Sequence, residues 1–268
     1  MLKIPELNGR ILMLEPRRLA ARAAAEHMAQ ILGEPVGQTI GYRIKGESKS
    51  SNKTRIEVVT EGILTRMIQS DGELSGISAV IFDEFHERSL HADLGLALCL
   101  EISDALREDL LLLVMSATLE TDPISKLMGN APIICAQGRS FPVTPVWLDR
   151  PLAKNTRFET TFGALILKAI DETQGGVLAF LPGEREIHAV ASYLISRLPK
   201  GCDLQLLYGA LPFAKQRAVI APMGDGRKVV LATSIAETSL TIEDIRIVVD
   251  AGKARRSQFD AASGMSRL

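Results

Sequence analysis

The stretch Ala79-Val80-Ile81-Phe82-Asp83-Glu84-Phe85-His86 joins a short apolar run to a cluster of ionisable side chains. A continuous apolar run of this length predicts a strand that is buried on both faces, as in a parallel sheet covered by helices. Ligands of such sheets bind beyond the carboxyl ends of the strands. Asp83 and Glu84 are therefore predicted to lie at a binding edge.

The same pattern recurs on both sides of this stretch, because short apolar runs alternate with longer amphipathic segments. Strands are expected at 11–14, 56–59, 79–82, 110–115, 177–180, 204–207, 229–232 and 245–249, and helices at 18–32, 62–68, 91–106, 123–128, 157–172, 184–198 and 213–220. This alternation predicts an α/β protein with mainly parallel sheets flanked by helices. A proline-bearing segment at 141–151 separates two such series, so we expect two domains, 1–145 and 152–268.

Composition sets limits on the function. The 268 residues are 46% hydrophobic and 24% charged, which predicts a packed core rather than disorder. The net charge of −1 gives no argument for nucleic-acid binding, so any basic groove must come from particular residues.

The three cysteines, Cys99, Cys135 and Cys202, form no C-x-x-C pair and are expected to be buried thiols. No apolar run is long enough to span a membrane and no signal peptide is evident, so we expect a soluble, cytoplasmic protein without a membrane partner.

Two other kinds of site are not supported. A zinc-protease site needs two histidines four residues apart on a helix, whereas His86 and His91 are five apart, about 140° around a helix. No Gly-x-Gly-x-x-Gly segment follows any predicted strand, which argues against dinucleotide binding.

The carboxylate pair itself favours nucleotide hydrolysis. In folds of this type one carboxylate holds Mg²⁺, usually through water, and its neighbour orients or deprotonates the attacking water. A solvated acidic turn after a strand is the alternative. The four residues Asp83 to His86 alone do not decide between a hydrolytic site and such a turn.

Other segments carry a specific resemblance. Asp83-Glu84-Phe85-His86 resembles the acidic motif of DEAH-box helicases, with Phe85 at the alanine position. Five further segments resemble motifs of that family in the same order, namely Glu15 to Arg22, Thr60 to Leu64, Ser116 to Thr118, Phe180 to Ile187 and Ala232 to Ile242. Ser234 stands where asparagine is usual. The chain is most similar to the bacterial HrpB type within the family.

The resemblance implies two RecA-like domains that form an ATP-dependent helicase with ATP and Mg²⁺ as cofactors. Asp83 would hold Mg²⁺ through water, and Glu84 would activate the attacking water. His86 would link the nucleotide site to Ser116 and Thr118. The alternatives are that Ser116 and Thr118 cap the next helix and that His86 makes a core hydrogen bond.

The second domain is implied to complete the nucleotide site. Thr241 and Glu243 would approach the nucleotide across a cleft between the two domains. ATP would favour closure of this clamp and hydrolysis would relax it, so that contacts along a single strand change.

The nucleic-acid contacts implied by the resemblance lie mainly at strand-to-helix turns. They are expected at Arg17, Arg18, Arg43, Thr60, Glu61, Gly62 and Thr233. Arg17 and Arg18 begin a helix, where cations oppose the helix dipole, so an anionic partner is favoured. Contacts to the backbone would be largely indifferent to base sequence. The partner is expected to be a single strand, RNA rather than DNA because of the family resemblance.

Two motifs of the family have no match in the chain. Gly41 to Ser48 has phosphate-cradle spacing, but Glu47 replaces the lysine and a strand is expected to follow, so we reject it. The cradle is expected upstream of Glu15 and an arginine motif beyond Leu268. We therefore expect a chain truncated at both ends, whose partner is the remainder of the full-length helicase and which alone binds ATP weakly and hydrolyses it negligibly. A non-hydrolysing nucleic-acid-binding remnant is the alternative.

Overall fold

The computed structural model describes residues 1–118, 122–136, 138, 141–148, 156–237, 242–255 and 258–267. The chain divides into two compact units, Met1–Phe141 and Pro142–Leu268. The predicted domain limits 1–145 and 152–268 stay predictions, because 149–155 lie outside the described residues.

The first unit is built on a six-stranded sheet in the order β3-β2-β4-β1-β5-β6. Its strands are β1 (Arg10–Glu15), β2 (Ile40–Ile44), β3 (Glu47–Lys49), β4 (Ile56–Thr60), β5 (Ile77–Phe82) and β6 (Leu111–Val114). Only β3 runs antiparallel to its neighbour; the other pairs are parallel. All six residues of β5 are buried, as its apolar sequence predicts.

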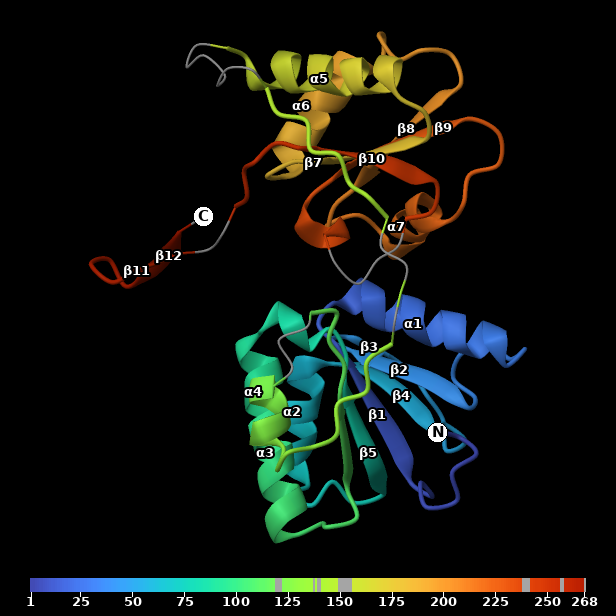
Figure 1. Cartoon of the computed structure of the whole chain (residues 1–268), viewed down its shortest axis with the longest axis vertical. Coiled ribbons are helices and arrows are strands. Elements are labelled where there is room, and N and C mark those ends of the chain that lie inside the picture. Colours follow the sequence, from blue (N-terminus) through green and yellow to red (C-terminus); the bar gives the residue numbers. More distant parts are fainter. Residues whose placement is uncertain are drawn as a thin grey trace. The chain divides into compact units, whose positions relative to one another are not determined.

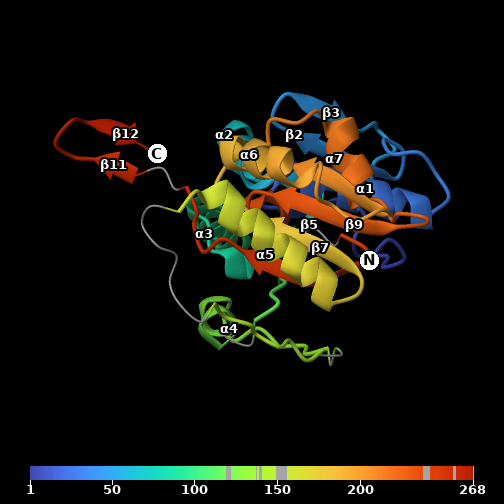
Figure 2. The same cartoon turned by 90° about the horizontal axis from the view of Figure 1, so that it is seen from above.

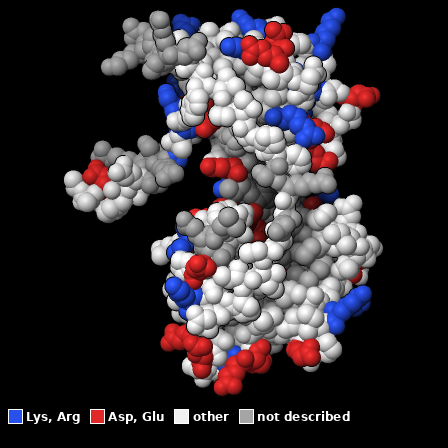
Figure 3. Space-filling model, in the orientation of Figure 1, with Lys and Arg blue, Asp and Glu red and all other residues white. Residues whose placement is uncertain are grey.

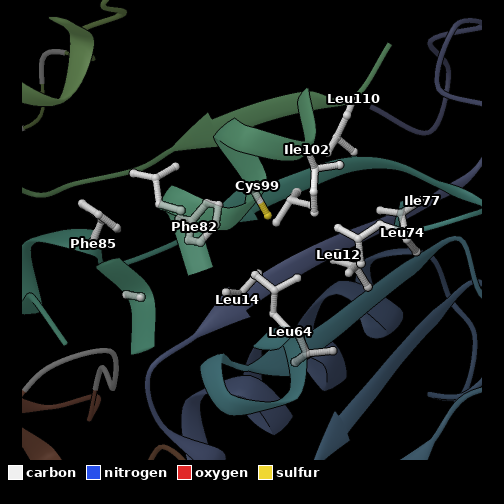
Figure 4. Packing of buried hydrophobic residues seen from close by; sticks show 14 residues of the cluster. Leu12, Leu14, Leu64, Leu74, Ile77, Phe82, Phe85, Cys99, Ile102 and Leu110 are labelled. Atoms are coloured by element: carbon white, nitrogen blue, oxygen red, sulfur yellow. The ribbon is translucent and has the colours of Figure 1, made fainter. Parts of the chain in front are cut away.

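Helices cover both faces of this sheet (Figure 1). Helix α1 (Arg18–Ile31) packs its alanines on one face, against β2 and β4. Helices α2 (Glu61–Ser70) and α3 (Leu90–Ala105) cover the other face, where the buried core shown in Figure 4 lies. A 3₁₀ turn (Phe85–Glu87) precedes α3, and a short helix α4 (Asp122–Leu127) follows β6.

The segment rejected as a phosphate cradle forms a hairpin. Its residues make up β2 and β3, joined by a turn in which Gly46 has a φ of +82°. The next regular element is strand β4, not a helix, and Glu47 accepts a hydrogen bond from the Tyr42 hydroxyl. The rejection is confirmed, although the two strands themselves were not predicted.

The second unit holds a four-stranded parallel sheet in the order β10-β7-β9-β8. Its strands are β7 (Gly176–Phe180), β8 (Cys202–Leu207), β9 (Arg227–Ala232) and β10 (Ile245–Asp250). Helices α5 (Phe158–Glu172) and α6 (Glu184–Leu194) lie side by side on one face, and α7 (Phe213–Ile220) packs on the other (Figures 1 and 2). Helix α6 ends four residues before its predicted end at 198.

Three smaller features complete the description. A two-stranded hairpin, β11 (Gln258–Asp260) and β12 (Met265–Arg267), was not predicted. Cys99 is buried as expected, but Cys202 is only partly buried and Cys135 is exposed, so the expectation of three buried thiols was wrong. Among the described residues, no helix has the length and apolar character needed to cross a membrane.

Candidate functional site

The carboxyl edge of the first sheet brings together four segments that are distant in sequence. Parallel pairing sets Glu15 of β1 level with Thr60 of β4, and Leu14 level with Phe82 of β5. Beyond the strand ends, the Asp83 N–H donates to the Leu14 carbonyl at 3.1 Å. The segment after β6 joins the same edge, since the Phe85 N–H donates to the Met115 carbonyl at 3.0 Å.

The acidic pair sits at the tip of a fully buried strand, as predicted. Asp83 Oδ1 accepts a 2.8 Å hydrogen bond from the Glu84 N–H. Glu84 lies in the left-handed region, with φ 49° and ψ 34°, and this sharp turn starts the 3₁₀ helix. Phe85 anchors the turn: its side chain is buried and meets Phe82 edge to face, with ring centroids 6.1 Å apart (Figure 4). The larger residue at the family's alanine position thus fills core space.

His86 lies against the segment that follows β6. Its Nδ1 accepts a 3.3 Å hydrogen bond from the Ala117 N–H and lies 3.4 Å from Glu84 Oε2. On either side of Ala117, the hydroxyls of Ser116 and Thr118 are 3.1 Å apart. The structure therefore brings together all five residues predicted as catalytic, while their chemical roles stay predictions.

The electrostatics of this edge are dominated by acids. Glu15 is only 4% exposed, and its Oε2 has no hydrogen-bond partner among the described residues. Burial, followed by repulsion from Asp83 and a hydrogen bond with it, raises the pKa of Glu15 to about 8. Burial, and then the charge of Asp83, also raise the pKa of Glu84. Crowded carboxylates of this kind would be relieved by a cation.

This edge fits a magnesium ion that keeps several of its water ligands. Within the part of the chain that the structure describes, no three His, Cys, Asp or Glu side chains are arranged as a metal-binding set. Mg²⁺ in phosphate-binding sites keeps several waters and needs only one or two carboxylates besides the substrate. Asp83 beside a buried, repelled acid supplies that kind of environment.

Five of the six predicted nucleic-acid residues of the first unit, all except Arg43, lie at two helix N-termini on the same edge. Arg17 is the N-cap of α1, Arg18 begins the helix and is exposed, and no acidic side chain offsets them in the first turn. Thr60 is the N-cap of α2, and Glu61 and Gly62 form its first turn. Apart from its chain neighbours and the backbone of its own helix, no described heavy atom lies within 4 Å of the place where a Gly62 Cβ would be. Each helix N-terminus thus has one solvent-exposed residue, Arg18 in α1 and Gly62 in α2.

Arg43 has a structural partner. Its guanidinium donates to both oxygens of Glu57, at 3.0 and 3.1 Å, and Arg10 donates to the same carboxylate at 2.8 Å. Glu57 is fully buried, so the two arginines compensate a buried charge. A role for Arg43 in nucleic-acid binding stays a prediction.

The second unit separates two of its predicted residues. Thr233 follows β9 at the carboxyl edge, where its N–H donates to the Leu207 carbonyl at 3.1 Å. Glu243 is exposed and precedes Asp244, whose carbonyl accepts a 2.8 Å bond from the first residue of β7, Gly176. Glu243 therefore lies near the amino edge of this sheet. The third predicted residue, Thr241, falls outside the described residues.

Sequence reasoning missed three residues at the first edge. Glu15 was named only as the first residue of a motif, although an acidic residue at the end of an apolar strand itself indicates a candidate site residue. Glu87 lies 3.4 Å from the Arg17 guanidinium. Ser89 is the N-cap of α3, accepting from the Ala92 N–H, and its hydroxyl also donates to Glu61.

Comparison with known proteins gives the family. Residues 1–127 match the DEAD/DEAH box helicase family, and residues 162–262 match the helicase conserved C-terminal domain. The chain is 50% identical, over 98% of its length and 32% of the relative's, to the ATP-dependent RNA helicase HrpB of Escherichia coli strain K12. It is 38% identical, over 97% of its length and 20% of the relative's, to the ATP-dependent RNA helicase HrpA homolog of Haemophilus influenzae.

Solved structures agree with the sequence relatives. A crystal structure of the Escherichia coli DEAH/RHA helicase HrpB superposes with a TM-score of 0.92 at 49% identity, covering 99% of this chain and 34% of that one. The predicted fold of two RecA-like α/β domains is confirmed. The chain spans about a third of the length of the HrpB proteins it matches. With both helicase domains matched in order, the chain belongs to the DEAD/DEAH box helicase family and is similar along its length to HrpB.

Proposed function

We propose that the chain supplies the two motor domains, 1–145 and 152–268, of a cytoplasmic helicase that uses ATP and Mg²⁺ to move along or unwind RNA. One observation carries the proposal. The turn that holds Asp83 and Glu84 is hydrogen-bonded through His86 to the segment after β6, and the N-termini of α1 and α2 lie on the same sheet edge. The names of the relatives, ATP-dependent RNA helicases, support this choice of nucleic acid.

On the nucleotide side, the two carboxylates have different tasks. Asp83 would hold a hydrated Mg²⁺, which neutralises phosphate charge when bound. Glu84 would accept a proton from the attacking water, a task favoured by its raised pKa. His86 would transmit the state of this turn to Ser116 and Thr118 through the Ala117 N–H.

On the nucleic-acid side, charge and backbone donors act together. The guanidinium groups of Arg17 and Arg18 and the N–H groups of two helix N-termini would bind phosphates. Gly62 leaves room for a close approach. Thr233 of the second unit would bind the same strand. The further predicted contacts are Arg43, Thr60 and Glu61 to the strand, and Thr241 and Glu243 to the nucleotide.

A strand-displacement assay tests the proposal. The protein as its gene encodes it is mixed with an RNA duplex that has a single-stranded tail and a labelled short strand. We expect release of the label with ATP and Mg²⁺, and none with ATP plus excess EDTA. Binding of the RNA without ATP hydrolysis would instead favour the non-hydrolysing remnant, and absence of both would contradict the proposal.

A further inference from the structure

The segment from Asp83 to Ser89 connects β5 to α3, and its two ends are held in different ways. Backbone hydrogen bonds fix the start, where the Asp83 N–H donates to Leu14 of β1 and the Phe85 N–H donates to Met115, just after β6. The middle is a single 3₁₀ turn between two left-handed residues, Glu84 and Arg88, both with φ 49°. A turn of this kind has few backbone hydrogen bonds of its own, so side-chain contacts determine its position.

Side-chain contacts with residues at the N-termini of α1 and α2 help to hold the far end of this segment. Arg17 Nη2 lies 3.4 Å from Glu87 Oε2, and the Ser89 hydroxyl donates to Glu61. Both outside partners belong to the helix N-termini at which nucleic-acid binding is proposed. The segment that carries the two carboxylates is thus attached to both proposed phosphate-binding turns.

The Arg17–Glu87 pair is the contact that a nucleic-acid strand would disturb. The Arg17 side chain is 24% exposed and that of Glu87 17%, so the pair is partly desolvated while the guanidinium remains reachable from solvent. A phosphate approaching the N-terminus of α1 would meet a guanidinium already next to a carboxylate. Two anions would then compete for one cation.

We propose that Glu87 is a positioning residue that holds Arg17 against the Asp83–Ser89 segment, and that an RNA phosphate competes with Glu87 for Arg17. The inference rests on the proposed RNA binding of the first unit. By linkage, the factor by which the intact Arg17–Glu87 contact weakens RNA binding equals the factor by which bound RNA weakens the contact. The contact therefore links RNA binding to the geometry of the acidic pair.

Binding of a fluorescein-labelled single-stranded oligouridine, followed by anisotropy, tests the competition in the 268-residue chain. Glu87→Gln removes the competing charge with little change of shape. We expect about two- to fivefold tighter binding, the range for a partly exposed ion pair. Glu108→Gln, an equal charge change at an exposed site before β6, is the control and should leave affinity nearly unchanged.

The decisive comparison is the same substitution in an Arg17→Met background. If the two side chains compete as proposed, Glu87→Gln has no effect once Arg17 is absent. If Glu87→Gln tightened RNA binding equally with and without Arg17, the cause would be the loss of a negative charge acting at long range. That result would overturn the inference. No change in either background, or an Arg17→Met variant that binds as tightly as wild type, would also overturn it while leaving the proposed function in place. Failure of the wild-type chain to bind RNA would contradict both the inference about Glu87 and the proposed function.

Hydrogen exchange of the wild-type chain gives a second readout that needs no substitution. The N–H groups of Glu87 and Arg88 donate to Glu84 and Phe85 at 2.9 and 3.2 Å. If RNA withdraws Arg17, this turn loses a side-chain contact and both amides should exchange faster. Unchanged or slower exchange on adding RNA would contradict the inference.

Discussion

Glu15 shows how the site depends on contacts that the sequence does not reveal. Its pKa is raised because β1 and β5 are adjacent in the sheet, which places the carboxyl beside Asp83, 68 positions later in the chain. The acidic pair itself was predictable, since it follows an apolar run directly. The raised pKa of Glu15 was not predictable, because it depends on a residue that follows another strand.

Glu15 also gives a pH prediction. Its folded-state pKa, about 8, lies above the ordinary value of 4.5, so folding takes up a proton between these values and stability falls as pH rises through that window. Glu15→Gln keeps the shape without the charge. We expect it to raise the free energy of unfolding by about 1–3 kcal/mol at pH 8 and to change it little at pH 5.

Urea unfolding at the two pH values measures this difference. Glu108→Gln, which removes an exposed carboxylate, serves as the control and should show no such dependence. A gain from Glu15→Gln that is equal at both pH values would show that the Glu15 carboxyl is not held protonated by its surroundings.

At the scale of elements, hydrophobic pattern predicted the elements that build the core and failed at the short ones. The buried strands β5 and β9 contain the continuous apolar runs 79–82 and 229–232, so their type was evident. The hairpin β2–β3 was missed because β3 has only three residues, Glu-Ser-Lys, which show no apolar pattern. The end of α6 was placed too late, because the apolar spacing continues past the last helical residue.

The first turn of α2 gives a prediction that separates function from stability. Gly62 is helical and has open space around it, so Gly62→Ala should stabilise the helix by about 0.5–1 kcal/mol. The added methyl group should nevertheless weaken RNA binding several-fold by blocking close approach. Gly72→Ala, just beyond the other end of α2 and also in open space, is the matched control for affinity. Unchanged RNA affinity in Gly62→Ala would remove Gly62 from the interface.

The packing of α5 on α6 gives the opposite prediction for a glycine. A Cβ at Gly163 would lie 2.3 Å from the Tyr193 ring, so no room exists for alanine. Gly163→Ala should lower the free energy of unfolding of the second unit by about 1–3 kcal/mol, although alanine is the better helix former. Gly209→Ala, in open space, is the control in denaturant unfolding followed by circular dichroism. A more stable Gly163→Ala protein would show that helix propensity outweighs the crowding.

At the scale of the whole molecule, net charge gave no hint of a nucleic-acid partner. The chain carries 31 basic and 32 acidic residues, and on the face drawn in Figure 3 the two kinds lie in small separate groups. The proposed interface depends instead on a few cations at strand-to-helix turns. The motif order along the chain predicted it, whereas composition did not.

Salt dependence tests whether those few cations bind phosphates. The affinity of the chain for single-stranded RNA should fall with salt, and Arg18→Met should reduce the slope of log K against log salt by about 0.7, the value for one phosphate of a single strand. Arg246→Met, an exposed cation in β10, should leave the slope unchanged. Equal slopes for wild type and Arg18→Met would exclude Arg18 from phosphate contact.

ATP hydrolysis by the Glu84→Gln protein, as its gene encodes it, tests most directly whether the acidic edge of the first sheet is a hydrolytic site. We predict a loss of about 10²- to 10⁴-fold in the RNA-stimulated rate, the range for removal of a general base. RNA affinity should stay close to that of wild type. Hydrolysis at the wild-type rate would contradict the assignment of the catalytic base, and with it the account of this edge.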